Sequence, residues 1–190
     1  MNEYSLMARP KSDEKRALLL DAAASVVAER GDGAPTALIA RAAGVAEGSL
    51  FTYFRNKRTL LTELHSALIA EAFAAVPAAV DARADSREKF LCLWTSLLRW
   101  VRSNPKKWTA LRVLQLSNLV DERRRRDVMT EGRQVLVEKL GIPDDPPGFP
   151  IRVFNAFIEL TIELTRERPR LAKRYSAAGF DAFWRAVARG

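Results

Sequence analysis

Residues 36–57 read TALIARAAGVAEGSLFTYFRNK, and the fold can be worked out from this stretch outward. Apolar residues recur at helical spacing on both sides of Gly44, which predicts one short helix over about 35–43 and another over about 46–54. Gly44 tolerates the left-handed backbone that a tight turn between two helices needs. Ala40 is small enough to let the helices approach closely. The stretch therefore predicts a helix-turn-helix.

The outer face of the second helix is expected to be short, polar and nearly flat, because Leu50 and Phe54 turn inward. Insertion into the major groove of DNA requires such a face. We expect the Tyr53 hydroxyl to donate to one phosphate, and Lys57, next to the helix cap Asn56, to hold a second. The expected DNA-binding residues are Thr36, Ala46, Glu47, Gly48, Ser49, Thr52, Tyr53, Asn56 and Lys57.

Helical spacing and helix punctuation continue along the rest of the chain, without the alternation or the Asn-Gly hairpins of strands. Ser12 is expected to cap a first helix that ends near Gly31. Asp85 and Glu88 have the spacing of a capping box. The remaining helices are expected at about 57–76, 86–103, 105–118, 121–140, 151–168 and 171–188. The prediction is an all-α fold of about nine helices, a count that rests on hydrophobic periodicity.

The motif resembles the signature of the tetracycline-repressor (TetR) family of transcriptional regulators. That signature runs I-A-x-x-A-G-V, then S/A-x-G-x-L-Y/F-x-Y/H-F, then x-x-K-x-x-L. This chain reads IARAAGV at 39–45, AEGSLFTYF at 46–54 and RNKRTL at 55–60. The close match covers about residues 12–70, and the remainder resembles the family only in the number and length of its helices.

The resemblance implies a homodimeric repressor whose helix at about 46–54 reads a palindromic operator in double-stranded DNA. It also implies a helical domain that binds a small molecule, which weakens DNA binding. Thr52 and Tyr53 would be the main base- and phosphate-contacting residues, and Lys57 the phosphate-binding lysine. We expect a helix-turn-helix DNA-binding domain at 12–72 and an effector-binding and dimerisation domain at 73–190.

Two positions of the second helix depart from the usual pattern. Ala46 stands where serine is common, which removes a cap worth about 0.5–2 kcal/mol. Glu47 lies on the reading face, where a carboxylate repels phosphate but can accept a hydrogen bond from a cytosine amine. The first departure costs stability, and the second is expected to influence sequence preference.

An effector pocket is expected in the second domain, around a helix at 86–103 that is apolar almost all round and should be central to it. Few polar groups are available there, which favours a mostly apolar or aromatic ligand. For any single residue, plain core packing is the alternative. The candidate effector residues are Trp94, Leu97, Trp108, Leu111, Gln115, Phe154 and Phe157.

The last two helices, at about 151–168 and 171–188, carry more apolar surface than one core needs, which predicts a four-helix dimer interface. Two other classes stay open. One is a TetR-like DNA-binding protein without a small-molecule effector, acting with a protein partner or structurally. The other is a helical enzyme or carrier that only contains the motif, which the lack of a catalytic constellation makes the weaker alternative.

Composition and charge limit what can be concluded about function and location. The net charge is +8, but residues 1–64 contribute +1 and residues 65–190 contribute +7, so overall charge does not identify the DNA-binding half.

The single cysteine, Cys92, fits a reducing cytoplasm. His65 and Cys92 lack neighbours at metal-ligand spacing, so we expect no metal, no cofactor and no enzymatic activity. No membrane span or signal peptide is expected, and the start is left open between Met1 and Met7.

Two clusters of basic residues invite a nucleic-acid interpretation. The arginines at 123–126 lie in a predicted helix beside acidic residues, and a solvated helix face is the favoured interpretation. Arg9, Lys11, Lys15 and Arg16 are the better candidates, as an N-terminal arm that reaches the DNA backbone or minor groove.

Overall fold

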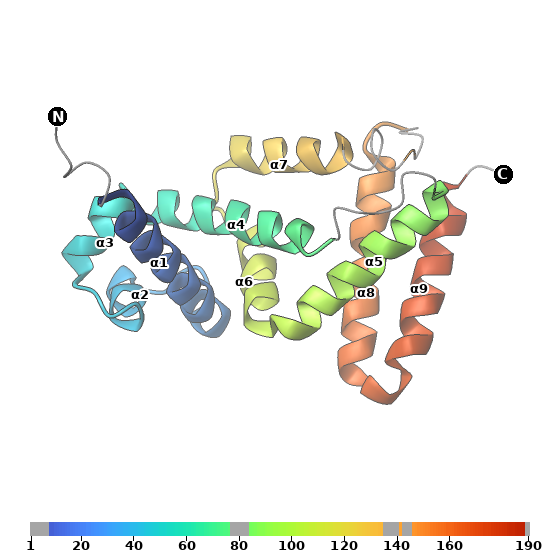
Figure 1. Cartoon of the computed structure of the whole chain (residues 1–190), viewed down its shortest axis with the longest axis horizontal. Helices are drawn as coiled ribbons and strands as arrows, with labels where there is room; N and C mark the ends of the chain where they lie inside the picture. The colour runs from blue at the N-terminus through green and yellow to red at the C-terminus, as the bar shows by residue number, and fades with distance from the viewer. Residues whose placement is uncertain (1–7, 77–83, 135–140, 142–145, 189–190) are drawn as a thin grey trace. The chain divides into compact units, whose positions relative to one another are not determined.

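The computed structural model describes residues 8–76, 84–134, 141 and 146–188, with side chains from residue 13 onward. This part of the chain is helical and contains no strand, as the all-α prediction required (Figure 1). The α-helices are α1 (Ala8–Arg30), α2 (Thr36–Ala42), α3 (Glu47–Tyr53), α4 (Lys57–Ala74), α5 (Ser86–Ser103), α6 (Pro105–Leu116), α7 (Glu122–Gln134), α8 (Phe149–Glu167) and α9 (Ala172–Val187). A 3-10 turn, Pro169–Leu171, joins α8 to α9.

Local capping explains several of these boundaries. The Thr59 backbone N–H donates to Asn56 Oδ1 at 2.9 Å, which caps α4 as expected. The expected capping box opens α5: the Glu88 N–H donates to Asp85 Oδ1 at 2.8 Å, and the Asp85 N–H donates to Glu88 Oε2 at 3.3 Å.

The predicted cap at Ser12 is wrong, because α1 already begins at Ala8. Pro10 lies in the first turn of the helix. Proline is tolerated there, since the first backbone N–H groups of a helix have no intrahelical acceptor. The helix therefore runs through Pro10 and leaves Ser12 inside it.

The helices pack into two compact units. One unit contains residues 1–70 and 104–124, and the other contains residues 71–103 and 125–190. The packing units therefore cross the expected boundary near residue 72, since α6 packs with α1 in the first unit. The division into a DNA-binding domain and an effector domain stays a prediction.

The first unit has one hydrophobic core. Leu19, Ala23 and Val27 follow one another at four-residue intervals on α1, and each is at most 1% exposed. They pack with leucines of α4 and α6 in the same cluster. Two ion pairs join the outer edges of α1 and α6: Lys106 Nζ lies 2.7 Å from Glu29 Oε1, and Lys107 Nζ lies 3.0 Å from Asp21 Oδ1. Each buried leucine contributes about 1.5–3 kcal/mol, whereas water and salt screen ion pairs at the surface, so the core dominates.

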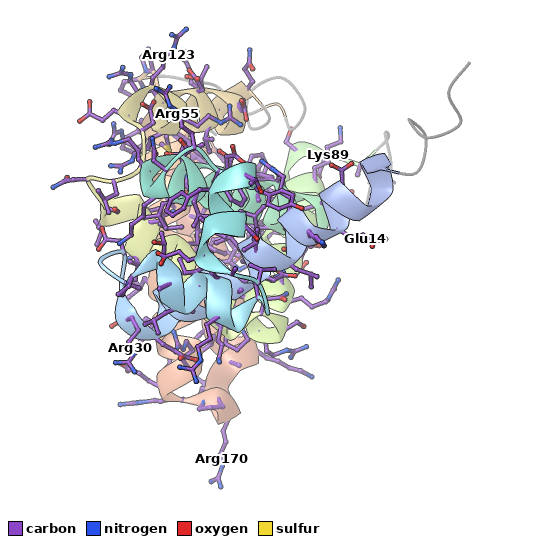
Figure 2. The ribbon with its side chains drawn as sticks, turned by 90° about the vertical axis from the view of Figure 1, so that its left-hand side faces the viewer. Glu14, Arg30, Arg55, Lys89, Arg123 and Arg170 are labelled. Atoms are coloured by element: carbon purple, nitrogen blue, oxygen red, sulfur yellow. The ribbon has the colours of Figure 1, made fainter. Side chains whose placement is uncertain are left out.

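The second unit is built around the hairpin of α8 and α9, which lie side by side, with α5 packed on both (Figure 1). In the turn between α8 and α9, Arg170 extends away from the ribbon into solvent (Figure 2). An aromatic cluster fills the core: the Trp94 ring stacks on Phe183 at 6.1 Å and meets Phe154 edge-on at 5.9 Å. Although α5 is apolar almost all round, it packs through one side, which includes Phe90, Trp94 and Val101, while Leu91 is 38% exposed.

Candidate nucleic-acid interface

α2 and α3 form the predicted helix-turn-helix, and Gly44 makes the turn. Its φ of +69° is in the left-handed region, which favours glycine. The Gly44 N–H donates to the Arg41 carbonyl at 3.1 Å, and the Val45 N–H donates to the Ala40 carbonyl at 3.0 Å. Ile39 and Leu50, both fully buried, anchor the two helices to the core.

The outer face of α3 is polar and open to solvent. Glu47, Gly48, Ser49 and Thr52 are all exposed, as expected for a surface that inserts into a groove. Nothing lies within 4 Å of a Cβ built on Gly48, so the backbone is accessible there. α3 itself contains no lysine or arginine, and Glu47 is its only charged residue.

Two exposed residues at this face were missed in the sequence interpretation. Phe51 is 44% exposed and follows Glu47 by one helical turn, so both occupy the same side of α3. The i,i+4 spacing was the available signal, but an aromatic residue next to Leu50 is easily assigned to the core. Arg55, just after α3, is also exposed (Figure 2) and can contact phosphate beside Lys57.

Tyr53 has a structural role as well as a position near the reading face. It is half-buried, and its ring packs against the core cluster of the first unit. The Tyr53 ring is therefore part of the packing of the first unit. The expected contact of its hydroxyl with phosphate stays a prediction.

Two hydrogen bonds order polar side chains on this face. The Thr52 hydroxyl donates to the Ser49 carbonyl at 2.6 Å, so its donor is already used. The Thr36 hydroxyl donates to Glu47 Oε1, also at 2.6 Å, and connects the start of α2 to the start of α3. In this arrangement the exposed Thr52 side chain has its methyl group and an accepting oxygen left for a ligand, and no donor.

The helix starts around the motif differ in their capping. Ala46 precedes α3 with extended backbone and no side-chain cap, in agreement with the predicted loss of a serine cap. Asn56 uses Oδ1 to cap α4, accepting from the Thr59 N–H at 2.9 Å and from the Thr59 hydroxyl at 3.1 Å. Its side-chain NH2 group is left as a donor for a ligand. Lys57, half-buried, is the first residue of α4.

The expected basic N-terminal arm is helical from residue 8 onward, so Arg9, Lys11, Lys15 and Arg16 all belong to α1. Arg16 pairs with Glu63, and its guanidinium carbon lies 5.3 Å from the centroid of the Phe54 ring. Arg16 therefore serves the packing of the first unit. The side chains of Arg9 and Lys11 lie outside the described part of the chain.

The candidate effector residues divide between the two packing units. Trp94 and Phe154 meet in the aromatic cluster of the second unit. Leu97 and Phe157 belong to the same unit and are half-buried. Leu111 belongs to the core of the first unit, with Trp108 packed against it and Gln115 on the same helix. Their assignment to one effector site stays a prediction.

The aromatic cluster encloses an unusual polar atom. Trp94 is completely buried, and among the described residues its Nε1 has no hydrogen-bond acceptor. A buried N–H without an acceptor costs about 1–3 kcal/mol. Such a donor would be satisfied by a ligand that brings an oxygen or nitrogen acceptor into this cluster.

The described residues contain no group of three or more His, Cys, Asp or Glu side chains arranged to hold a metal ion. None of the helices in the described ranges combines the length and the apolar character that a membrane span requires.

Comparison with known proteins places these features in a family. Residues 19–64 match the family model described as bacterial regulatory proteins, tetR family. A tetR family transcription regulator from Shewanella sp. PV-4 is 26% identical, with a TM-score of 0.82, and the match covers 93% of this chain and 99% of that one.

Two further structures share the fold at lower identity. LfrR from Mycobacterium smegmatis, solved in complex with proflavine, is 18% identical with a TM-score of 0.67, over 93% of this chain and 98% of its own. NalD from Pseudomonas aeruginosa, the secondary repressor of the MexAB-OprM efflux pump, is 20% identical with a TM-score of 0.66, over 95% and 98% of the two chains.

Proposed function

We propose that the chain is a DNA-binding transcriptional regulator of the TetR family, and that it acts as a ligand-responsive homodimeric repressor of a palindromic operator. The observation that carries this proposal is the exposed polar face of α3, held by a glycine turn on a buried three-helix core. Side chains at this face contact base edges, while Tyr53, Arg55 and Lys57 contact phosphates.

Dimerisation is supported by an apolar stripe on α8. Phe149, Val153, Ala156, Leu160 and Leu164 follow one another at spacings of three and four residues, which places them on one face. Phe149 is 45% exposed and Leu160 is 50% exposed. When two protomers pair these faces about a twofold axis, the apolar stripe is buried and the dimer carries two copies of α3. The two reading helices must lie about 34–36 Å apart to enter successive major grooves.

Effector control is supported by the aromatic cluster of the second unit and by the buried Nε1 of Trp94. Proflavine, a planar aromatic molecule, is bound by the structurally similar LfrR. We infer an apolar or aromatic effector that carries a hydrogen-bond acceptor. Its binding stabilises a dimer whose reading helices no longer match successive grooves, which lowers operator affinity.

The test is selection of binding sites from random duplex DNA at a fixed ionic strength near 0.15 M. Wild type is compared with Lys57→Ala and with Tyr53→Phe, which keeps the packed ring but removes the hydroxyl. Lys173→Ala, which removes an exposed lysine from α9, is the matched control.

We expect wild type and Lys173→Ala to enrich the same palindrome. Lys57→Ala should bind this site more weakly and with a salt dependence whose slope is lower by about 1 per lost phosphate contact. Enrichment of no site, or identical binding by wild type and Lys57→Ala, would overturn the proposed role of α3 and its flanking residues.

A further inference from the structure

The Thr36–Glu47 hydrogen bond joins the first residues of the two helices of the motif. Thr36 Oγ1 donates to Glu47 Oε1 at 2.6 Å, although the two residues lie 11 positions apart. A separation of 2.5–2.7 Å is typical of a hydroxyl bonded to a carboxylate, the stronger class of hydrogen bond. Glu47 is exposed, so without this bond its side chain would sample several rotamers.

The bond uses Oε1 and leaves the other carboxylate oxygen of this exposed side chain, Oε2, available as an acceptor. A carboxylate can only accept hydrogen bonds, and it repels phosphate. It can therefore approach DNA favourably only where a base edge offers a donor. In the major groove these donors are the N4 amine of cytosine and the N6 amine of adenine, while guanine and thymine expose acceptor oxygens.

Cytosine is the better partner of the two. Adenine presents the acceptor N7 beside its amine, so a carboxylate placed against adenine brings an acceptor next to an acceptor. The N4 amine of cytosine lies between C5–H and O6 of the paired guanine, so it has an acceptor on one side only, whereas the adenine amine lies between two acceptors, N7 and O4 of the paired thymine. The absence of lysine and arginine from α3 adds to this argument, because α3 cannot supply the cationic side chain that reads guanine.

We propose that Thr36 is a positioning residue, which holds Glu47 so that its free oxygen accepts from a cytosine amine at one position of each half-site. This inference rests on operator binding by α3. The hydrogen bond orders the side chain before DNA arrives, so binding does not have to restrict it again. Thr36 then influences base preference without itself contacting the base.

The experiment measures base preference at the Glu47 position. Sites are selected by wild type, Glu47→Gln, Thr36→Val and Thr36→Ser, and the affinity is then measured for four duplexes that differ only at the enriched base pair. Thr36→Val keeps the size and branching of threonine but removes the hydroxyl. Thr36→Ser keeps the hydroxyl, so it should rescue the preference. Thermal unfolding of each variant shows that it is folded.

We expect wild type to prefer cytosine over guanine and thymine by roughly fivefold or more, the lower end of what one specific base contact supplies. Glu47→Gln should shift the preference to adenine, because an amide offers both a donor and an acceptor. Thr36→Val should weaken the cytosine preference, and Thr36→Ser should restore it.

The outcomes separate the two levels of the proposal. If neither wild type nor any variant enriches a site, operator binding and this inference both fail. If a palindrome is enriched but Glu47→Gln leaves every base preference unchanged, operator binding stands and the readout by Glu47 is overturned. If Thr36→Val lowers the affinity for all four duplexes equally, Thr36 is a structural tie between α2 and α3 and not a positioning residue.

Discussion

The guanidinium carbon of Arg16 lies 5.3 Å from the centroid of the Phe54 ring, and the same guanidinium pairs with Glu63. Phe54 is the C-cap of α3, and Glu63 belongs to α4. One side chain of α1 therefore contacts both the end of α3 and the helix that follows it. The positive charge of Arg16 stabilises this arrangement through the face of an aromatic ring and through a carboxylate.

Arg16→Met should lower the free energy of unfolding by about 0.5–2 kcal/mol, the sum expected for a cation–π contact and an exposed ion pair. Methionine keeps an apolar stem over Phe54, so the effect isolates the charge. Urea unfolding followed by circular dichroism measures the change. Lys15→Met, at an exposed neighbouring position, is the control. Equal stability of the two variants would contradict a specific role for Arg16.

The ion pair between Glu29 and Lys106 should be visible in the titration of Glu29. The hydrogen bond and positive charge of Lys106 hold the pKa of Glu29 below its ordinary value of 4.5. The contribution of this pair is therefore present above the ordinary pKa and is lost as the pH falls through the lower, folded value. In Lys106→Ala the pKa of Glu29, followed by carboxyl NMR shifts, should rise toward 4.5. An unchanged pKa would show that the pair does not form.

Gly179 should not tolerate a methyl group. A Cβ at this position would overlap Thr161 Oγ1 and lie 3.0 Å from Trp94 Cζ2, at the crossing of α8 and α9. Overpacking of this kind costs about 1–3 kcal/mol. Gly179→Ala should therefore lower the unfolding free energy, although alanine favours helix by about 1 kcal/mol.

Gly132→Ala is the matched control for Gly179→Ala. It also lies in a helix of the second unit, but its added Cβ would meet only Ile151 Cδ1 at 3.7 Å, which is an ordinary contact. This variant should be neutral or more stable in the same urea experiment. If Gly179→Ala were as stable as Gly132→Ala, the close approach of α8 and α9 would be refuted.

Trp94→Phe tests the buried indole N–H. The substitution removes a donor that lacks an acceptor among the described residues, which offsets part of the packing lost with the larger ring. We expect an unfolding free energy within about 1.5 kcal/mol of wild type, since loss of the whole side chain costs about 3–5 kcal/mol and removal of an unpaired donor recovers about 1–3 kcal/mol. A loss of 3 kcal/mol or more in chemical denaturation would indicate that the N–H is satisfied in the free protein.

Leu160→Glu should abolish dimerisation without unfolding the protomer. Leu160 is 50% exposed in the single chain and central to the apolar stripe of α8, so a charge there is tolerated in the monomer but not in a buried interface. Sedimentation velocity at micromolar concentration should show a dimer for wild type and a monomer for Leu160→Glu.

The control for dimerisation is Leu116→Glu, which changes a leucine that is 80% exposed at the end of α6. It should remain dimeric. A monomeric wild type, or a dimer that Leu160→Glu leaves intact, would exclude the α8 stripe as the interface.

Local interactions made much of the fold predictable from the sequence. Asn56 caps α4, and Asp85 and Glu88 cap α5, through groups only three residues apart. The turn at Gly44 depends on the backbone freedom of one residue. The motif and its match to the tetR family model were therefore predicted correctly. Ser12 was the failure among the caps, because Pro10 can be placed in the first turn of a helix as well as before it.

The helices, the turn between α2 and α3, and the outward position of the polar residues of α3 could be predicted from the sequence, because these follow from contacts within about one helical turn. The packing of Arg16 with Glu63, the place of α6 in the first unit, and the contact of Thr36 with Glu47 became visible only in the folded chain. These relationships join residues from different helices. Helical periodicity indicates that a residue is buried or exposed, but the partner is chosen by how the helices pack.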